Sequence, residues 1–373
     1  MFDTEDEKLI NKRVEAFEGV VLGHEKFTQV MNRVRFHLSS PASVQIVVLV
    51  GPTGIGKSLM MGHILKKLNE MRSRRPDEPD FRPVAHTIAM ASGYRQFDFK
   101  TLYRDGLKNL GDPVFDRRDT IDRVYLRSLR LDTTASLRVR MQEEMYARNT
   151  YYWLVDEAQH LIFGGRSGTT GDQFDVLKSI SQMTNCVFLI AGPCMMDAEL
   201  ARSAQLVRRI VSVPFDRYHH DRPDDLAEFG SVANQLLSRM DLHKKPEAEQ
   251  ILTLLYDGSA GCVGILKDWL TRSYAMALKE SADPEGAVLT EEILRAMRLS
   301  AVNMETVMTD IRRLDYATKR NSSDDVYSDI VRGQASVQPD IPDDKPKDAP
   351  AAKRKVPVGV RKATRDPLVA PGM

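Results

Sequence analysis

Short apolar runs and amphipathic segments alternate along the first 215 residues of the chain. The apolar runs are rich in β-branched and aromatic residues and predict buried strands, whereas the segments between them have the periodicity of helices. Strand and helix repeated in this order predict a doubly wound parallel sheet, an α/β fold. The predicted strands are residues 44–50, 84–90, 151–155, 186–191 and a short strand after residue 209, and the predicted helices are residues 59–68, 98–110, 172–183 and 197–204.

The pattern changes at residue 218, after which the apolar positions recur only with helical spacing. Successive amphipathic segments predict a small all-α domain. The first 40 residues are polar, and residues 25–38 among them predict a helix with one apolar face. The predicted helices of the all-α domain are residues 223–240, 246–256, 262–279 and 290–300.

Residues beyond 319 have a third character, because large apolar side chains become rare and Pro, Asp, Lys and Ala dominate from residue 339 onward. Such a segment buries too little surface to offset the entropy of ordering it, so we predict a disordered basic tail. Its basic patches, residues 353–355 and 361–365, have two open interpretations: a solvated tail, or a segment that binds a partner or DNA phosphates. We therefore expect an N-terminal helical segment (1–40), an α/β domain (41–218), an all-α domain (219–318) and a flexible tail (319–373).

Composition, charge and cysteine spacing limit the kinds of protein that this chain can be. With 42% hydrophobic and 28% charged residues, the 373-residue chain is an ordinary globular protein, and its net charge of +1 means that any basic surface must be local. The cysteines Cys186, Cys194 and Cys262 lack metal-ligand spacing, which predicts reduced thiols. The acidic first seven residues do not form a secretory signal, and the longest apolar run is too short to span a bilayer. We expect a cytoplasmic protein that is not in a membrane.

A glycine-rich motif follows the first predicted strand and precedes a predicted helix. Strand, glycine-rich turn, lysine, hydroxyl and helix together form a P-loop, in which backbone N–H groups and the helix N-terminus hold phosphates. Lys57 is placed to reach the outer phosphates of ATP, and the Ser58 hydroxyl to bind Mg²⁺. The residues of the motif are Gly51, Pro52, Thr53, Gly54, Ile55, Gly56, Lys57 and Ser58.

Two carboxylates, Asp156 and Glu157, stand at the end of the predicted strand that starts at Tyr151. The carboxyl ends of parallel strands form the edge of the sheet where ligands bind. We therefore expect Asp156 to hold the Mg²⁺ shell and Glu157 to polarise an attacking water.

The assembled pattern looks like an AAA+ ATPase, with a P-loop sheet, Asp-Glu on a central strand, an arginine pair before the last strand and a helical lid. Several local motifs resemble the TniB/TnsC family of transposition ATPases, over roughly residues 15–300. The matching stretches are Leu22-Gly23-His24-Glu25-Lys26-Phe27, Val155-Asp156-Glu157-Ala158-Gln159-His160-Leu161, Leu177-Lys178, residues 187–192 and Gly261-Cys262-Val263-Gly264-Ile265-Leu266-Lys267.

The resemblance implies a regulator of DNA transposition that binds ATP and assembles as a ring or helical filament on duplex DNA. It further implies a target selector of the TniQ type and a transposase as partners, with ATP hydrolysis disassembling or proofreading the complex. A helix ahead of the P-loop, here residues 25–38, would line the adenine side of the site or simply cover the sheet.

Three positions depart from the family pattern. Gly192-Pro193 ends a strand where a polar sensor residue is usual, with Cys194 as a weak substitute, and Gly264 stands where many relatives carry a sensor arginine, with Lys267 one turn later as the candidate. Arg208 and Arg209 both fit the position of the arginine finger, and we choose Arg209. Missing sensors imply slow hydrolysis, which suits a regulatory switch.

Candidate DNA contacts are basic residues of the sheet domain. They are Lys100, Arg104 and Lys108 on the predicted helix 98–110, and Arg117 and Arg118 at the start of an arginine-rich stretch that ends at Arg148. Acidic residues within that stretch also fit a salt-bridged helical face. The competing hypothesis is an AAA+ signalling or chaperone-like switch that acts on protein partners without nucleic acid. The pair His219-His220 has the look of metal ligands, but it lies between domains without cysteine support, so we expect no metal there.

Overall fold

The computed structural model describes residues 5–39, 44–91, 97–115, 133–163, 170–196, 208–281 and 283–321, together with Ser328 and Arg332. Its contacts divide the chain into two units, residues 1–322 and 323–373, and the sheet and its helices belong to the first. The predicted helix 197–204 and nearly all of the predicted tail lie outside the described residues.

Two expectations from composition can be compared with the described part of the chain. None of its helices is both long and apolar enough to cross a bilayer. Cys186 and Cys262 are buried free thiols, and burial raises the pKa of both, that of Cys262 to about 12.

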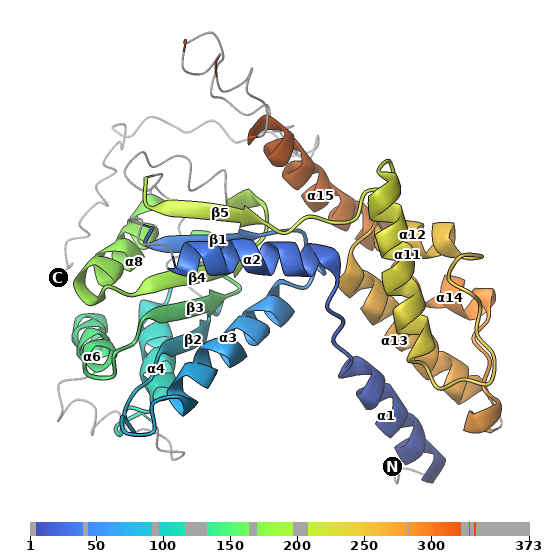
Figure 1. Ribbon diagram of the computed structural model, residues 1–373, viewed down its shortest axis with the longest axis horizontal. Helices are drawn as coiled ribbons and strands as arrows, with labels where there is room; N and C mark the ends of the chain where they lie inside the picture. The colour runs from blue at the N-terminus through green and yellow to red at the C-terminus, as the bar shows by residue number, and fades with distance from the viewer. Residues whose placement is uncertain are drawn as a thin grey trace, which may run out of the picture. The chain divides into compact units, whose positions relative to one another are not determined.

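Five parallel strands form one sheet in the order β2-β3-β4-β1-β5 (Figure 1). This order confirms the predicted doubly wound parallel sheet: the chain crosses from β1 to the edge strand β2, returns through β3 to β4 beside β1, and then places β5 on the other side of β1. The carboxyl ends of β1 and β4 are level, since Val50 pairs with Gly192. The strands are β1 (Ile46–Val50), β2 (Val84–Ile88), β3 (Tyr152–Asp156), β4 (Val187–Gly192) and β5 (Ile210–Pro214).

Helices cover both faces of the sheet, so the α/β domain has three layers. Alternate side chains of β1 point to opposite faces: Ile46, Val48 and Val50 join one apolar core, and Val47 and Leu49 join the other. The first core is closed by α4 (Phe99–Leu110), α6 (Thr134–Ala147) and α8 (Thr170–Thr184), and the second by α2 (Glu25–Ser39) and α3 (Lys57–Ser73).

The lid is helical, as predicted, and packs around Trp269, which is fully buried and donates its indole N–H to the Leu294 carbonyl at 2.8 Å. The predicted helix 246–256 begins only at residue 252. Residues 246–251 are not helical, and just before them Lys244 forms a bridge with Val288 across the lid. The lid helices are α11 (Pro223–Ser238), α12 (Leu252–Ser259), α13 (Val263–Glu280) and α14 (Glu291–Met297).

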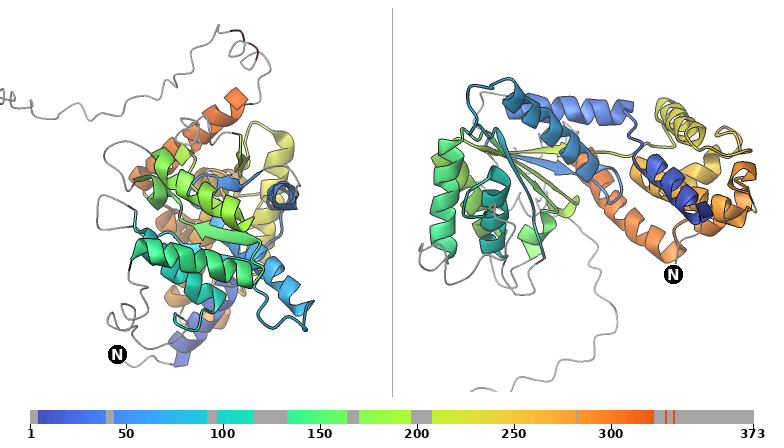
Figure 2. Two further views of the ribbon diagram at one scale, coloured as in Figure 1. Left: turned by 90° about the vertical axis from the view of Figure 1, so that its left-hand side faces the viewer. Right: turned by 90° about the horizontal axis from the view of Figure 1, so that it is seen from below.

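The first 40 residues serve two different parts of the structure. Helix α1 (Glu5–Glu18) packs against α13 of the lid, where Ile10 and Phe17 enter the lid core and the Phe17 ring meets Tyr274 edge-on at 5.6 Å (Figure 2). Helix α2, in contrast, covers the sheet. The predicted N-terminal segment therefore joins lid and sheet.

A long helix after the lid, α15 (Ala301–Asn321), leads back to the sheet domain (Figure 1), and no helix was expected there. Ile311 packs with the core beneath α2 and α3, and Leu314 reaches the core on the other face. The sequence did carry the signal, because apolar residues recur with helical spacing at Met304, Val307 and Ile311.

Candidate nucleotide-binding site

The P-loop, residues 51–58, connects the carboxyl end of β1 to α3, whose first residue is Lys57. Gly54 and Gly56 have φ angles of 75° and 107°, a left-handed conformation that glycine adopts without strain. The loop therefore curls over the N-terminus of α3, where backbone N–H groups and the helix dipole favour an anion. Ser58 is exposed in the first turn of this helix.

Lys57 is held at the mouth of the loop. Its ammonium donates hydrogen bonds to the carbonyls of Gly51 (2.7 Å) and Pro52 (2.9 Å). Burial lowers the pKa of Lys57, while Cys194, Asp310, Asp156 and Glu157 act in the opposite direction. Electrostatically, the predicted phosphate-binding lysine and the two predicted carboxylates belong to one site.

Asp156 and Glu157 follow each other but have different environments. Asp156 is the last residue of β3 and is 9% exposed, and its Oδ1 accepts a hydrogen bond from the Glu157 N–H at 2.9 Å. Glu157 has a φ of 55°, unusual for a non-glycine residue, and its exposed side chain accepts a hydrogen bond from Gln159. The turn therefore keeps one carboxylate inside the site and presents the other to solvent.

The residues at this edge of the sheet have the chemistry needed to bind a nucleoside triphosphate with Mg²⁺. Hydroxyl and carboxylate oxygens, which Ser58 and Asp156 supply, are the ligands that Mg²⁺ prefers. A Mg²⁺ held by these two residues would supply positive charge to the outer phosphates, in addition to that of Lys57. The exposed Glu157 carboxylate, directly after Asp156, is accessible to a water molecule that attacks from solvent.

The two expected sensor positions are filled by backbone contacts. Gly192 accepts a hydrogen bond from the Gly51 N–H at 3.4 Å, and a side chain on Gly192 would collide with Met196. Gly264 packs directly on Gly54, where a Cβ would strike the Gly54 carbonyl, and Ile265 donates its N–H to that same carbonyl at 3.0 Å. At Gly264 the lid therefore touches the P-loop through backbone.

The expectation that Lys267 substitutes for the sensor arginine is not supported by its contacts. Its ammonium donates to the carbonyls of Glu18 and Val20, both at 2.6 Å, and burial lowers its pKa. Lys267 thus satisfies carbonyls at the end of α1 and is not directed at the P-loop, because a lysine one turn along α13 from Gly264 faces the α1–α2 connection.

Arg208 and Arg209 lie at the opposite edge of the sheet from the P-loop. The Arg209 carbonyl accepts hydrogen bonds from Gln45 (2.9 Å) and Ile46 (3.2 Å), at the start of β1, whereas the P-loop follows the end of β1. The length of the strand separates the two by about 15 Å, at about 3.3 Å per residue. Arg209 is therefore far from the P-loop of its own chain.

We expect Arg209→Ala to lower ATP hydrolysis in the assembled protein by about 10²-fold or more, as for arginine fingers, with little effect on ATP binding to the isolated chain. Steady-state phosphate release, measured at high protein concentration where the protein assembles and at low concentration where it does not, shows whether the loss of hydrolysis depends on assembly. Arg72→Ala, which removes an exposed arginine in the last turn of α3, is the control, and Arg208→Ala tests the other arginine that fits the finger position. An equal effect of Arg209→Ala at every protein concentration would contradict a role across subunits.

Three of the five predicted DNA contacts share one face of α4. Lys100, Arg104 and Lys108 are spaced by one helical turn, and the last two line a surface hollow of about 270 Å³ with Asp105 and Phe115. Arg117 and Arg118 lie outside the described residues.

Described arginines further along the arginine-rich stretch are engaged within the protein. Arg140 pairs with Asp112 (2.9 Å) and Glu144 (2.8 Å), and Arg148 pairs with the same Glu144 (2.8 Å). For these positions on and beside α6, the structure favours the salt-bridged interpretation over DNA contact.

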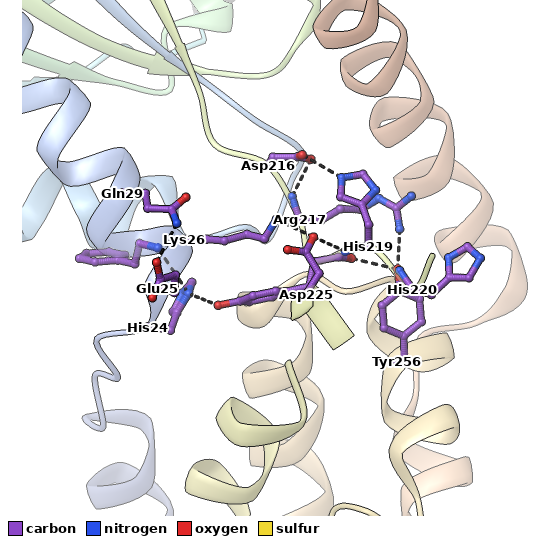
Figure 3. A network of polar contacts seen from close by, with 12 residues as sticks. His24, Glu25, Lys26, Gln29, Asp216, Arg217, His219, His220, Asp225 and Tyr256 are labelled. Atoms are coloured by element: carbon purple, nitrogen blue, oxygen red, sulfur yellow. Dashed lines mark hydrogen bonds and ion pairs between the residues drawn. The ribbon is translucent and has the colours of Figure 1, made fainter. Parts of the chain in front are cut away.

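A buried arginine connects the sheet to the lid. Arg217, just after β5, is 9% exposed and donates to the Tyr256 hydroxyl of α12 at 2.8 Å and to the Ala260 carbonyl at 3.3 Å (Figure 3). Its other terminal nitrogen lies 3.2 Å from a carboxylate oxygen of Asp315 on α15. One guanidinium therefore connects the end of β5, the lid and α15.

Further ion pairs surround this hinge. Lys26 of α2 pairs with Asp225 of α11 at 2.8 Å, and His219 bonds Asp216 at 2.8 Å. Burial alone would raise the pKa of Asp216, but the hydrogen bond with His219 acts in the opposite direction and the pKa is lowered. Ligand atoms of Asp216, His219 and Asp315 lie within 4.8 Å of one another, but the nearby Arg217 guanidinium already supplies positive charge to this group.

His24, in the motif ahead of α2, also takes part in the hinge. Its Nδ1 lies 2.9 Å from the Tyr218 hydroxyl, and burial together with the charge of Lys26 lowers its pKa to about 4, so the ring is neutral at pH 7. Phe27 and Val34 of the same helix are buried against the sheet. The first turn of α2 thus contacts the hinge, while the rest covers the sheet.

Comparison with known proteins agrees with this architecture. Residues 42–195 match the family model described as AAA domain. The Aeropyrum pernix ORC2 protein in its ADP form is 14% identical with a TM-score of 0.50, over 77% of this chain and 71% of that one. The same protein in its ADPNP-ADP complexes is 14% identical with a TM-score of 0.51, over 79% and 74%.

A Walker-type ATPase of Pyrococcus abyssi was also found, at 13% identity and a TM-score of 0.48, over 78% of this chain and 76% of that one. None of the curated proteins matches the chain. The matched domain spans the P-loop, Asp156 and Glu157, and the sheet that carries them has the order β2-β3-β4-β1-β5. Residues 42–195 thus match the AAA-domain family model, and the chain has the α/β fold of the P-loop AAA+ ATPases.

Proposed function

We propose that the protein binds ATP with Mg²⁺ and hydrolyses it to ADP and phosphate. The observation that carries this proposal is that the P-loop with Lys57 lies at the same edge of the sheet as Asp156 and Glu157. In the proposed reaction, Glu157 accepts a proton from a water whose oxygen bonds to the terminal phosphorus, and the bond from that phosphorus to the leaving ADP oxygen breaks. The ADP and ADPNP forms of the similarly folded Aeropyrum pernix ORC2 protein support a nucleotide at such a site.

We further propose that hydrolysis regulates DNA transposition. In this proposal the ATP-bound protein assembles on duplex DNA, links a TniQ-like target selector to a transposase, and is released when ATP is hydrolysed. The resemblance of its local motifs to the TniB/TnsC family supports the role. The position of Arg209 supports the proposed assembly. Arg209 lies at the edge of the sheet opposite the P-loop of its own chain, so as an arginine finger it would act on the nucleotide site of a neighbouring subunit.

The proposal is tested by mixing the protein with duplex DNA at low salt in the presence of ATP, ADP or no nucleotide. We expect ATP alone to give rings or filaments on DNA, visible by electron microscopy. If ATP produces no DNA-dependent assembly, the transposition role is wrong, while ATP hydrolysis by the same sample would keep the enzymatic proposal intact.

The face of α4 is proposed to contact DNA phosphates. A triple Lys100→Ala, Arg104→Ala, Lys108→Ala variant should weaken DNA binding and reduce the slope of log K against log salt by about 3, at about 0.9 per phosphate contact. Titration of labelled duplex DNA at several salt concentrations measures the slope. A variant with the same change of charge at the exposed lysines Lys8, Lys12 and Lys66 is the control.

If the slope of log K against log salt is unchanged in the α4 variant, the residues that contact DNA are not those of α4. The competing function, a switch that acts on protein partners, is favoured by the near-neutral net charge and by the ion-paired arginines of α6. Absence of DNA binding at low salt, with retained ATP hydrolysis, would support that function instead.

A further inference from the structure

An acidic residue of α15 contacts the P-loop. The Asp310 Oδ2 of α15 accepts a hydrogen bond from the backbone N–H of Thr53 at 3.3 Å. The two residues are 257 positions apart in the sequence. Asp310 is half-buried, and burial raises its pKa, opposed by the charge of Lys57 and by the Thr53 hydrogen bond.

The group that Asp310 contacts belongs to the loop that is proposed to bind phosphate. Backbone N–H groups of the P-loop form the anion-binding concavity, and Lys57 neutralises the outer phosphates. Asp310 places a carboxylate beside both, since it bonds to the Thr53 N–H and acts electrostatically on Lys57. A carboxylate and a terminal phosphate at this place compete for the same donors and repel each other.

The rest of α15 holds Asp310 in position. Ile311, the next residue, is 1% exposed in the core beneath the P-loop helix, and Leu314 is 2% exposed one turn later. Asp315 then pairs with Arg217 at the hinge between sheet and lid. Asp310 can therefore leave the P-loop only if this part of α15 shifts or the Asp310 side chain changes rotamer.

We propose that Asp310 is a specificity-determining residue of the nucleotide site: its carboxylate competes with the terminal phosphate, disfavours ATP relative to ADP, and couples ATP binding to displacement of Asp310 and α15 from the P-loop. This inference rests on the proposed ATP binding at the P-loop. It adds a sensing element from α15 to a site whose two usual sensor positions are glycines.

The first test is the ratio of ATP to ADP affinity, measured with fluorescent analogues of the two nucleotides. Asp310→Asn keeps the shape of the side chain and removes its charge, so it should tighten ATP binding about tenfold and change ADP binding much less, because ADP lacks the terminal phosphate. Glu305→Gln, the same change at an exposed position earlier on α15, should leave both affinities unchanged.

An ATP-to-ADP ratio that is equal in Asp310→Asn and the unaltered protein would overturn the inference while leaving the proposed function intact. Failure of both proteins to bind either nucleotide would overturn both. Lys57→Ala in the same assay identifies nonspecific nucleotide binding, because binding at the P-loop should be lost in this variant.

The second test needs no nucleotide. Asp310→Ala should speed hydrogen exchange of the Thr53 amide severalfold, whereas Glu305→Ala should not, because it is Asp310 that accepts a hydrogen bond from that amide. Adding ATP to the unaltered protein should likewise speed exchange along α15. Unchanged exchange at Thr53 in Asp310→Ala would overturn the contact itself.

Discussion

Glu157→Gln is expected to slow ATP hydrolysis by about 10²- to 10⁴-fold, the range for loss of a general base, while leaving ATP affinity within about twofold. The expectation follows from the arrangement at the end of β3, where Glu157 is exposed and Asp156 is the buried neighbour. Glutamine has the same size, so it keeps the hydrogen-bonding contact with Gln159 but cannot accept a proton from water. Single-turnover hydrolysis and equilibrium ATP binding separate the two effects.

The same variant should accumulate in the ATP-bound assembly on DNA, because the step that resets it is blocked. Electron microscopy of DNA complexes after ATP addition, followed over time, measures this persistence. Glu143→Gln, at an exposed position of α6, is the matched control and should hydrolyse ATP at the normal rate. Loss of ATP binding in Glu157→Gln would contradict the assignment of Glu157 to the chemical step.

Lys57→Ala is expected to weaken ATP binding about 100-fold, and with it to abolish hydrolysis and ATP-dependent assembly on DNA. The half-buried ammonium lies at the mouth of the P-loop, where we expect it to exchange its hydrogen bonds to two loop carbonyls for a charge-assisted contact with the outer phosphates. ATP affinity measured by calorimetry gives the effect directly.

Lys66→Ala provides the control, because Lys66 is an exposed lysine more than two turns further along α3. Thermal unfolding of both variants checks that the loss is not caused by unfolding, since Lys57 also tethers the loop through Gly51 and Pro52. Assembly on DNA that persists unchanged in Lys57→Ala would show that the P-loop does not control it.

Local patterns were sufficient for the sheet domain. The apolar runs predicted all five strands, and the glycines of the P-loop predicted a phosphate-binding turn, because both features depend on residues close together in the chain. The predicted helix 98–110 likewise matches α4, with Asp98 capping its first turn. The boundaries of the predicted helix 246–256 differ from those of α12, which begins at Leu252 and ends at Ser259.

The contacts of single side chains depended on distant partners. Lys267 has the right position for a sensor on α13, yet the carbonyls at the end of α1 hold its ammonium. Arg140 and Arg148 carry charges that fit DNA, but Glu144 of α6 engages both. The choice between such partners is made by which groups packing brings within hydrogen-bond distance.

The sequence by itself determined the order of the strands along the chain, the P-loop, and the pair Asp156 and Glu157, since each is written in a few consecutive residues. Only the tertiary structure decided the sheet order, the backbone contact between lid and P-loop at Gly264, and the contact of Asp310 with Thr53. Helical spacing could have revealed α15, but not where it would pack. A contact across 257 residues is fixed by burial of Ile311 and Leu314 in two cores, and no local pattern encodes that placement.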